Sequence, residues 1–298
     1  APSVLGTCNQ PKAAIVFDWE NWWAVEGAEA VTNPFGYDRR WLPFYQAFWR
    51  LGIDVDIVDM EDPLEGYSLV VAPYNYMYRG NYIETVKDYV AKGGTYVTTC
   101  WSGEVDDSDL CFLDRHPLGD VLGIRTEEID VSPAYVHNQI SWQGKDYAIR
   151  ELCALVHVET AEVLGVYEKD FYAGYPALTK NNYGEGEAYF IASENDDAFL
   201  LDFLGYLAER TGSGSSLRVN GELPYGVTVN ERRPVESSAS GEVASAETEK
   251  GSLWFVQNFN SGSATMDFAE RYRDIETGEI IEGKKELTGY QCLILEQA

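Results

Sequence analysis

The sequence has 298 residues, 45% hydrophobic and 24% charged, which is typical of a globular protein with one large or two ordinary domains. Its 22 basic and 49 acidic residues give a net charge of −27, which disfavours nucleic acid and anionic membranes as partners. No apolar run reaches the roughly 20 residues of a membrane span. The first residues show no secretory signal and no initiator methionine, so we expect a trimmed piece of a longer protein.

The first hundred residues alternate short apolar runs with segments of helical spacing. Predicted strands are 13–18, 54–59, 68–74 and 95–100, and predicted helices are 38–51 and 81–92. The second helix ends at Gly93-Gly94, a common C-terminal signal. This order predicts an open, mostly parallel α/β sheet with helices on both faces.

The middle of the chain is less regular and ends in a linker. It contains a predicted short helix at 116–123, strands at 124–130 and 161–168, a strand pair within 176–193 and a helix at 196–210. The stretch TGSGSS (211–216) has linker composition. We therefore predict one α/β domain over residues 10–212 and a linker at 213–216.

After the linker the pattern changes to short alternating strands separated by turns. Residues 217–298 contain no long helical pattern, which predicts a small antiparallel β-sandwich. Within it, the Ser- and Ala-rich stretch 237–251 is predicted to be a mobile loop between two strands.

The cysteines and histidines give no sign of a metal or cofactor. Five cysteines are widely spaced without a CxxC pair, which argues against a zinc site or a disulfide framework and favours a reducing, cytoplasmic location. A three-histidine site would need His116, His137 and His157 together. The first strand is followed by DWENWW instead of a glycine-rich turn, so we expect no dinucleotide.

Cys100 is the candidate nucleophile, because it ends a strand before the sharp corner Trp-Ser-Gly. Class I glutamine amidotransferases hold a cysteine at such an elbow and use a His-x-Glu pair, which His157-Val158-Glu159 could supply. The pattern departs at Thr98, where the elbow has glycine. A buried strand cysteine and a packed histidine are the alternative interpretation.

Two acidic patterns suggest other chemistry. The loop 103–110 carries alternating acids but lacks the glycine of a calcium loop, so a solvated turn is the simpler interpretation. Asp18 and Glu20 would lie on one side of an extended strand end, about 7 Å apart, a spacing compatible with glycoside cleavage. Any x-D-x-E pair on a strand has that spacing, so it does not identify a catalytic site.

Several segments resemble, in order, the non-catalytic part of family-42 glycoside hydrolases, the bacterial β-galactosidases. They include IVFDWENWWA, YSLVVAPYNYMY, YVAKGGTYVTTCWSGEVDDSD, HPLGDVLGIRTEE, FYAGYPALTKNNYGEGEAYFIAS and LPYGVTVNERR. The resemblance implies a flavodoxin-like (class I amidotransferase-like) trimerisation domain and a small C-terminal β domain. It also implies a separate (β/α)₈ barrel with two catalytic glutamates, and no stretch here resembles either glutamate.

The resemblance therefore implies a non-catalytic role in assembly and active-site framing, with a homotrimer, the barrel and a galactoside as partners of the parent enzyme. Our candidates for a subunit interface or the wall of the active-site cup are Asp18, Trp19, Glu20, Asn21, Trp22, Trp23, Trp101 and Ser102. Two other functions stay open, namely a stand-alone sugar-binding module that uses the tryptophans and an enzyme that uses Cys100. It is equally open that the tryptophans cover the edge of their own sheet.

Overall fold

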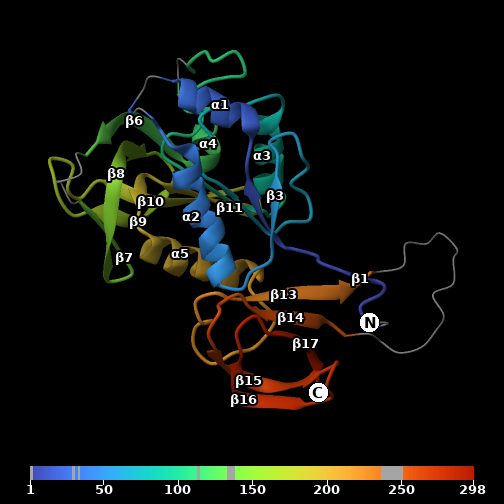
Figure 1. The fold of residues 1–298 in the computed structure, drawn as a ribbon. Helices are drawn as coiled ribbons and strands as arrows, with labels where there is room; N and C mark the ends of the chain where they lie inside the picture. The colour runs from blue at the N-terminus through green and yellow to red at the C-terminus, as the bar shows by residue number, and fades with distance from the viewer. Residues whose placement is uncertain (1–2, 29–30, 33, 113–114, 133–137, 236–250) are drawn as a thin grey trace, which may run out of the picture. The chain divides into compact units, whose positions relative to one another are not determined.

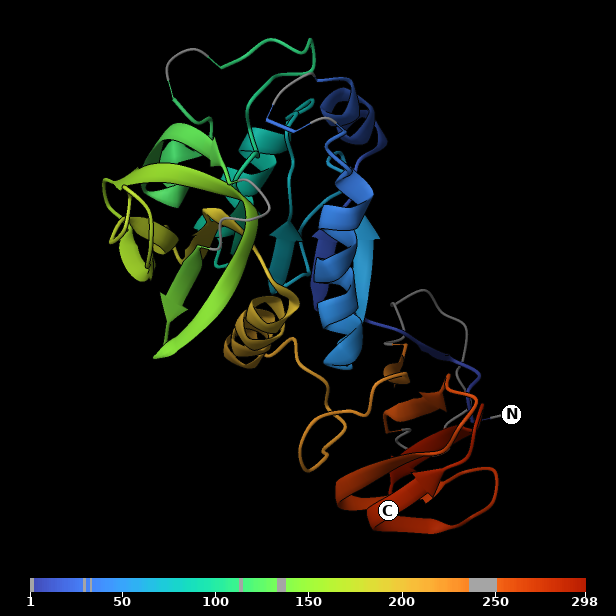
Figure 2. The same ribbon diagram turned by 60° about the vertical axis from the view of Figure 1, so that its left-hand side comes forward.

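The computed structural model describes residues 3–28, 31–32, 34–112, 115–132, 138–235 and 251–298. They form two compact units, drawn in Figures 1 and 2. The larger unit contains Lys12–Ala47 and Val55–Ser213, and the smaller contains Ala1–Pro11, Phe48–Asp54 and Gly214–Ala298. The predicted mobile loop at 237–251 lies outside the described residues, apart from Gly251. None of the helices in the described ranges is long and apolar enough to cross a membrane.

Five strands of the larger unit run parallel in the order β11-β5-β4-β2-β3. They are β2 (Ala13–Val16), β3 (Val55–Val58), β4 (Leu69–Ala72), β5 (Thr95–Thr99) and β11 (Gly186–Ile191). Every residue of β2, β4 and β5 is buried, as expected of strands covered on both faces. The predicted strands of the first hundred residues are confirmed, with slightly shorter bounds.

The same sheet continues with antiparallel strands, which makes eleven strands in the described residues. These are β6 (Ile124–Val131), β7 (Gln139–Trp142), β8 (Lys145–Val158), β9 (Glu162–Tyr167), β10 (Pro176–Tyr183) and β12 (Ser193–Asn195). The sequence analysis missed the β7–β8 hairpin. Its turn places Gln143 at φ 51° and Gly144 at φ 76°, so the Gln-Gly pair was the available signal.

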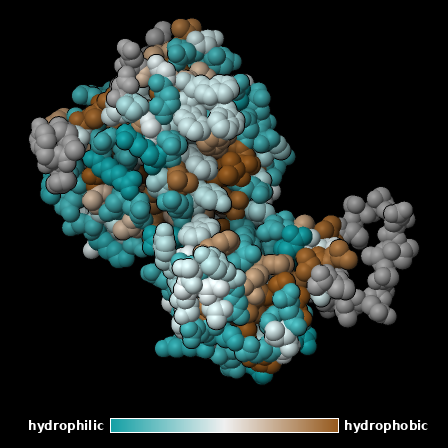
Figure 3. Space-filling model, in the orientation of Figure 1, coloured by the Kyte–Doolittle hydropathy of each residue, from teal (hydrophilic) through white to brown (hydrophobic). Residues whose placement is uncertain are grey.

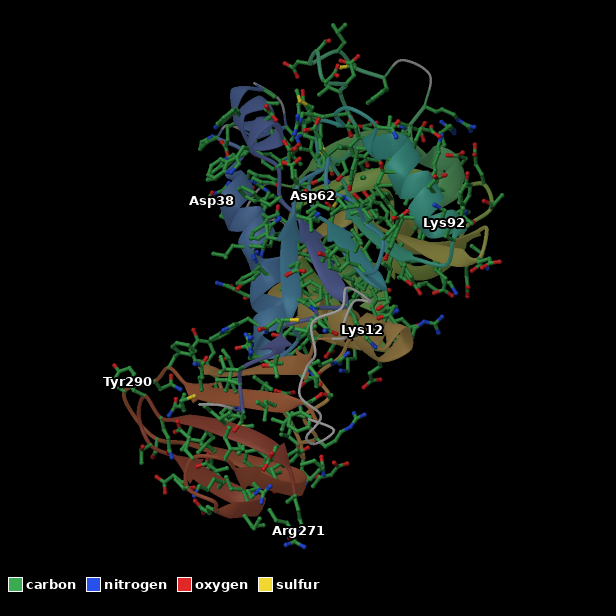
Figure 4. The ribbon with its side chains drawn as sticks, turned by 90° about the vertical axis from the view of Figure 1, so that its right-hand side faces the viewer. Lys12, Asp38, Asp62, Lys92, Arg271 and Tyr290 are labelled. Atoms are coloured by element: carbon green, nitrogen blue, oxygen red, sulfur yellow. The ribbon has the colours of Figure 1, made fainter. Side chains whose placement is uncertain are left out.

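Helices cover both faces of this sheet. They are α1 (Trp19–Gly27), α2 (Tyr37–Arg50), α3 (Tyr82–Ala91), α4 (Gly119–Leu122) and α5 (Asp197–Thr211). From β2 the chain moves to β3 at one edge of the parallel strands, whereas from β4 it moves to β5 towards the other edge. Because both crossovers are right-handed, α2 and α3 lie on opposite faces of the sheet. Figure 4 shows the strands between these two helices. All the predicted helices are present, and α1 was not predicted.

The described strands of the smaller unit form one six-stranded antiparallel sheet in the order β1-β13-β14-β17-β15-β16. They are β1 (Thr7–Cys8), β13 (Val227–Pro234), β14 (Leu253–Asn258), β15 (Ala264–Asp274), β16 (Ile280–Leu287) and β17 (Cys292–Gln297). Its core gathers apolar side chains from alternate positions, among them Val256, Phe268 and Leu295. The edge strand β1 pairs with the far end of β13, where Thr7 lies opposite Pro234.

Candidate functional site

The segment from Asp18 to Trp23, which we call the tryptophan corner, turns directly from β2 into α1. The Asp18 carboxylate accepts a hydrogen bond from the Asn21 backbone N–H at 2.7 Å, which caps the helix N-terminus. The expectation that Asp18 and Glu20 alternate along an extended strand end is therefore wrong. A capping acid, with a second acid in the first helical turn, starts a helix here instead.

Arg79 binds both acids of the corner. Its Nη2 lies 2.6 Å from Asp18 Oδ2, its Nη1 lies 2.8 Å from Glu20 Oε2, and Asp59 lies 3.4 Å away. Asp18 is fully buried, whereas the side chain of Glu20 is half exposed. Burial raises the pKa of Asp59. A guanidinium that holds these three carboxylates anchors the start of α1, an arrangement that suits a structural role better than general acid–base catalysis. The sequence analysis missed Arg79, which lies 61 residues from Asp18.

Asn21 ties α1 to the loop after β4. Its Nδ2 donates to the Tyr74 carbonyl at 3.2 Å, and its Oδ1 accepts the Met77 backbone N–H at 3.0 Å. The side chain is fully buried. A buried amide that satisfies two backbone groups fixes both segments, because leaving either group unpaired would cost about 1–3 kcal/mol.

The three indoles of the corner differ in exposure. Trp19 is 55% exposed and Trp23 is 65% exposed, while Trp22 is partly buried. The rings of Trp19 and Trp22 stack with centroids 5.2 Å apart, and Phe17 meets both edge-on. In Figure 3 the surface around α1 is paler than the hydrophilic faces beside it. The corner thus presents two indoles to solvent on an anchored helix.

Trp101 and Ser102 follow β5 and contact the same loop after β4. Trp101 has φ 60°, and its ring stacks on Tyr76 at 5.4 Å and on Phe35 at 6.4 Å. The Ser102 hydroxyl accepts the Asn75 backbone N–H at 3.1 Å and is buried. The structure therefore brings these two candidates to the carboxyl edge of the sheet near the corner. Within this chain, Trp101 and Ser102 support loops and are less exposed than Trp19 and Trp23.

Cys100 and His157 do not form a catalytic pair. Cys100 is completely buried, and burial raises the pKa of its thiol well above the ordinary value. His157 lies on β8, where it is paired through its ring nitrogen with the exposed Glu127. A completely buried thiol whose pKa is raised is a poor nucleophile. The structure thus supports the alternative interpretation of Cys100.

The acidic loop 103–110 folds as a turn. Asp106 Oδ1 accepts the backbone N–H groups of Ser108 and Leu110 at 2.8 and 3.1 Å. This arrangement uses the acid for its own loop, as in an Asx turn. Among the residues that the structure describes, no group of three histidine, cysteine or acidic side chains is placed to hold a metal ion.

Two titratable groups, the partly buried Glu104 in this turn and the buried His116, predict how stability changes with pH. Burial raises the pKa of Glu104 from 4.5 to about 7 and lowers the pKa of His116 from 6.5 to about 4. The folded state therefore binds the Glu104 proton more tightly than the unfolded state does. The resulting contribution of Glu104 to folding stability is complete below pH 4.5 and is lost as pH rises to 7. The His116 contribution has the opposite trend and is lost as pH falls from 6.5 to 4.

We expect Glu104→Gln to stabilise the protein at pH 8 and to leave its stability nearly unchanged at pH 4. At about 1.4 kcal/mol for each pH unit between 4.5 and 7, the gain is on the order of 3 kcal/mol. Urea unfolding of the wild type and of Glu104→Gln between pH 4 and pH 8 measures the difference in their unfolding free energies. The His116 contribution is the same in both proteins and cancels. A gain that is equal at pH 4 and pH 8 would contradict the assignment to Glu104.

This geometry defines a class of domain. The larger unit is an α/β domain of the class I glutamine amidotransferase-like type, with a mixed sheet that contains five parallel strands and a buried cysteine at the elbow. The family model for the β-galactosidase trimerisation domain matches residues 11–212, and the model for the β-galactosidase C-terminal domain matches residues 241–297. The chain belongs to glycoside hydrolase family 42, and the resemblance seen in the sequence is confirmed.

Named relatives and solved structures agree with this assignment. The chain is 37% identical to β-galactosidase Pbg of Clostridium perfringens, over 98% of this chain and 42% of the relative. It is 42% identical to β-galactosidase BglY of Alicyclobacillus acidocaldarius, over 72% of this chain and 33% of the relative. The crystal structure of β-galactosidase from Bacillus circulans sp. alkalophilus matches with a TM-score of 0.85 and 35% identity, over 99% of this chain and 42% of that one. The matches thus cover about a third to two fifths of the length of these relatives, which carry an additional region.

Proposed function

We propose that this chain is the assembly and active-site-framing portion of a β-galactosidase, and that the tryptophan corner forms part of a contact between subunits. The description of the matching domain as a trimerisation domain supports an oligomer. The observation that carries the proposal is the pair of exposed indoles, Trp19 and Trp23, on a helix whose start is fixed by Arg79.

The physical chemistry of the corner suits an interface. Tryptophan is enriched at the centres of protein interfaces because each ring removes a large apolar area from water. The Asp18, Asn21 and Arg79 contacts order α1 within this chain, so association does not have to order it. Copies with a net charge of −27 repel each other, so the contact needs an uncharged centre of this kind.

The parent enzyme would hydrolyse terminal β-galactosides in a (β/α)₈ barrel, which would correspond to the additional region of the relatives. Its partners would be that barrel, two further copies of itself and a galactoside, in a cytoplasmic location. The relatives are themselves named β-galactosidases, which supports the substrate class. This chain alone should not hydrolyse galactosides.

The expected result in solution is a trimer of the 33.4 kDa chain, measured by light scattering over a range of concentrations. Trp23→Glu should shift the mass towards the monomer, because it places a charge in the contact. Raising the salt concentration should favour the wild-type trimer by screening repulsion between acidic copies.

The matched control is Phe171→Glu, which alters another exposed aromatic side chain of the larger unit, 73% exposed. It should leave the mass unchanged. A trimer that survives Trp23→Glu would remove the corner from the interface. A wild-type monomer at all concentrations would mean that this chain does not assemble by itself.

A stand-alone sugar-binding module remains the second candidate, because the same exposure of Trp19 and Trp23 would also suit stacking on a sugar ring. The two functions differ in one readout. A sugar-binding corner predicts galactose binding that Trp23→Ala abolishes in a protein whose mass does not change.

A further inference from the structure

Three exposed aromatic side chains lie at one end of the six-stranded sheet. Tyr225 is 79% exposed, Phe259 59% and Tyr290 72%. They occupy the turns before β13, after β14 and between β16 and β17. The strand register brings these turns together, because Val227 pairs with Asn258 and Gln257 pairs with Cys292. We call residues 223–226, 258–262 and 287–291 the aromatic loops.

Hydrogen bonds connect the three aromatic loops to one another. The Phe259 backbone N–H donates to the Gly226 carbonyl at 2.8 Å, and the Tyr290 N–H donates to the Asn260 carbonyl at 3.1 Å. Asn260 Nδ2 donates to the Tyr225 carbonyl at 2.8 Å. The backbone beneath each of the three rings is therefore held by a neighbouring loop.

A buried amide fixes the centre of this arrangement. Asn258 is 2% exposed, and its Nδ2 lies 3.0 Å from the Gly262 carbonyl and 2.9 Å from the Thr288 carbonyl. Its Oδ1 accepts the Asn260 backbone N–H at 3.0 Å. The loops are thus positioned before any partner binds, which lowers the entropic cost of binding.

Tyr290 adopts a backbone conformation that a tyrosine rarely shows. Its φ is 59°, in the left-handed region that glycine and asparagine prefer. The preceding Gly289 has no room for a side chain, since a Cβ there would lie 2.2 Å from the Ser261 carbonyl oxygen. Figure 4 shows Tyr290 at the periphery of its unit, extending away from the sheet. Packing within the chain does not account for a large, strained and exposed side chain at this position.

The aromatic loops are uncharged, although the chain has a net charge of −27. They offer aromatic faces, hydroxyl groups and amides, and among the described residues the Ser261 hydroxyl and the Gln291 Nε2 donate no hydrogen bond. Without lysine or arginine they do not suit a phosphate, and without a carboxylate they do not suit a basic peptide. This chemistry fits a neutral ligand with apolar C–H faces and many hydroxyl groups.

We propose that Tyr225, Phe259 and Tyr290 form a binding site for a neutral oligosaccharide, separate from the tryptophan corner. The rings would stack on the C–H faces of pyranose units, and the amides and hydroxyls of the loops would bind sugar hydroxyls. The site is independent of assembly. The oligosaccharide proposal rests on the proposed function in one respect only, which is the choice of a β-galactoside as the probe.

The test is isothermal titration of this chain with a β-1,4-linked galactotetraose. The wild-type chain should bind saturably, and Phe259→Ala and Tyr290→Asn should each weaken binding on the order of tenfold, as expected for the loss of one aromatic stacking contact. Asparagine tolerates positive φ, so Tyr290→Asn removes the ring and keeps the turn. Tyr290→Phe keeps the ring and should bind like the wild type, as should the control Phe171→Ala.

Absence of binding by the wild type would overturn the proposal, and so would binding that ignores both ring deletions. A lower solution mass for Phe259→Ala or Tyr290→Asn would instead assign the loops to a contact between copies. The proposed function is tested separately, through the solution mass of the Trp23→Glu variant, so its failure can be told apart from these outcomes. A trimer that binds no galactotetraose would overturn only the oligosaccharide site.

Discussion

Replacing Arg79 with methionine should lower the free energy of unfolding by about 3 to 5 kcal/mol, the usual cost of removing one partner from a buried ion pair. Asp18 is fully buried, and Arg79 is the cation that binds it among the described residues, so the variant leaves an uncompensated carboxylate inside the protein. The Asp18 cap of α1 would weaken with it. Urea unfolding followed by tryptophan fluorescence measures the loss, since Trp19 and Trp22 stack beside this pair.

Two further variants separate the buried pair from the exposed one. Glu20→Gln removes only the half-exposed partner of Arg79 and should cost no more than about 1 kcal/mol. Arg79→Lys keeps the charge but loses the planar fork that contacts Asp18 through two nitrogens, so its cost should be intermediate. Equal losses for Glu20→Gln and Arg79→Met would contradict the primary role of Asp18.

Arg40→Met should have an effect of similar size elsewhere in the larger unit. The Arg40 side chain is 1% exposed, its Nε lies 3.1 Å from Glu194 Oε2, and its Nη2 lies 2.6 Å from Glu151 Oε2. Its guanidinium also lies 4.5 Å from the centre of the Phe35 ring. Methionine fills part of the space but leaves Glu194 buried without its cation, so we expect a loss of about 3 to 5 kcal/mol.

A double variant tests the cause of that loss. Arg40→Met combined with Glu194→Gln removes both charges of the buried pair, and it should recover much of the stability lost in the single variant. Thermal unfolding with a matched Arg39→Met control completes the comparison, because the Arg39 side chain is 57% exposed. A double variant as unstable as the sum of the two single variants would show that packing, not charge, dominates at Arg40.

The sequence predicted most of the fold because the buried parallel strands and the amphipathic helices carry strong local patterns. The run AAIVFD and the helix 81–92 were read from their own residues. These patterns cannot indicate a function. The family resemblance implied that this chain has a non-catalytic role and that a separate barrel carries the catalytic residues. The domain limits at 212 and 217 stay a prediction.

The sequence analysis placed the tryptophan corner directly after the first strand, which is correct, but gave it the wrong local structure. Asp18 was read as the end of a strand, although its position before Glu20 and Asn21 also fits a helix cap. Arg79 could not have been found, because only the fold brings it to Asp18. The exposure of each indole also depends on three-dimensional packing, so Trp22 and Trp23 could not be told apart from sequence.

The pairing of β1 with β13 has a consequence for synthesis. Thr7 and its hydrogen-bond partner Arg232 are 225 residues apart, so at about 5–20 residues per second the ribosome makes the first strand roughly 10 to 50 s before its partner. During that interval the β1 segment lacks its partner β13, while the larger unit can already be completed. The smaller unit is therefore the last part of the chain to finish folding. Until then its edge strand β1, which is made first, must not pair with other strands.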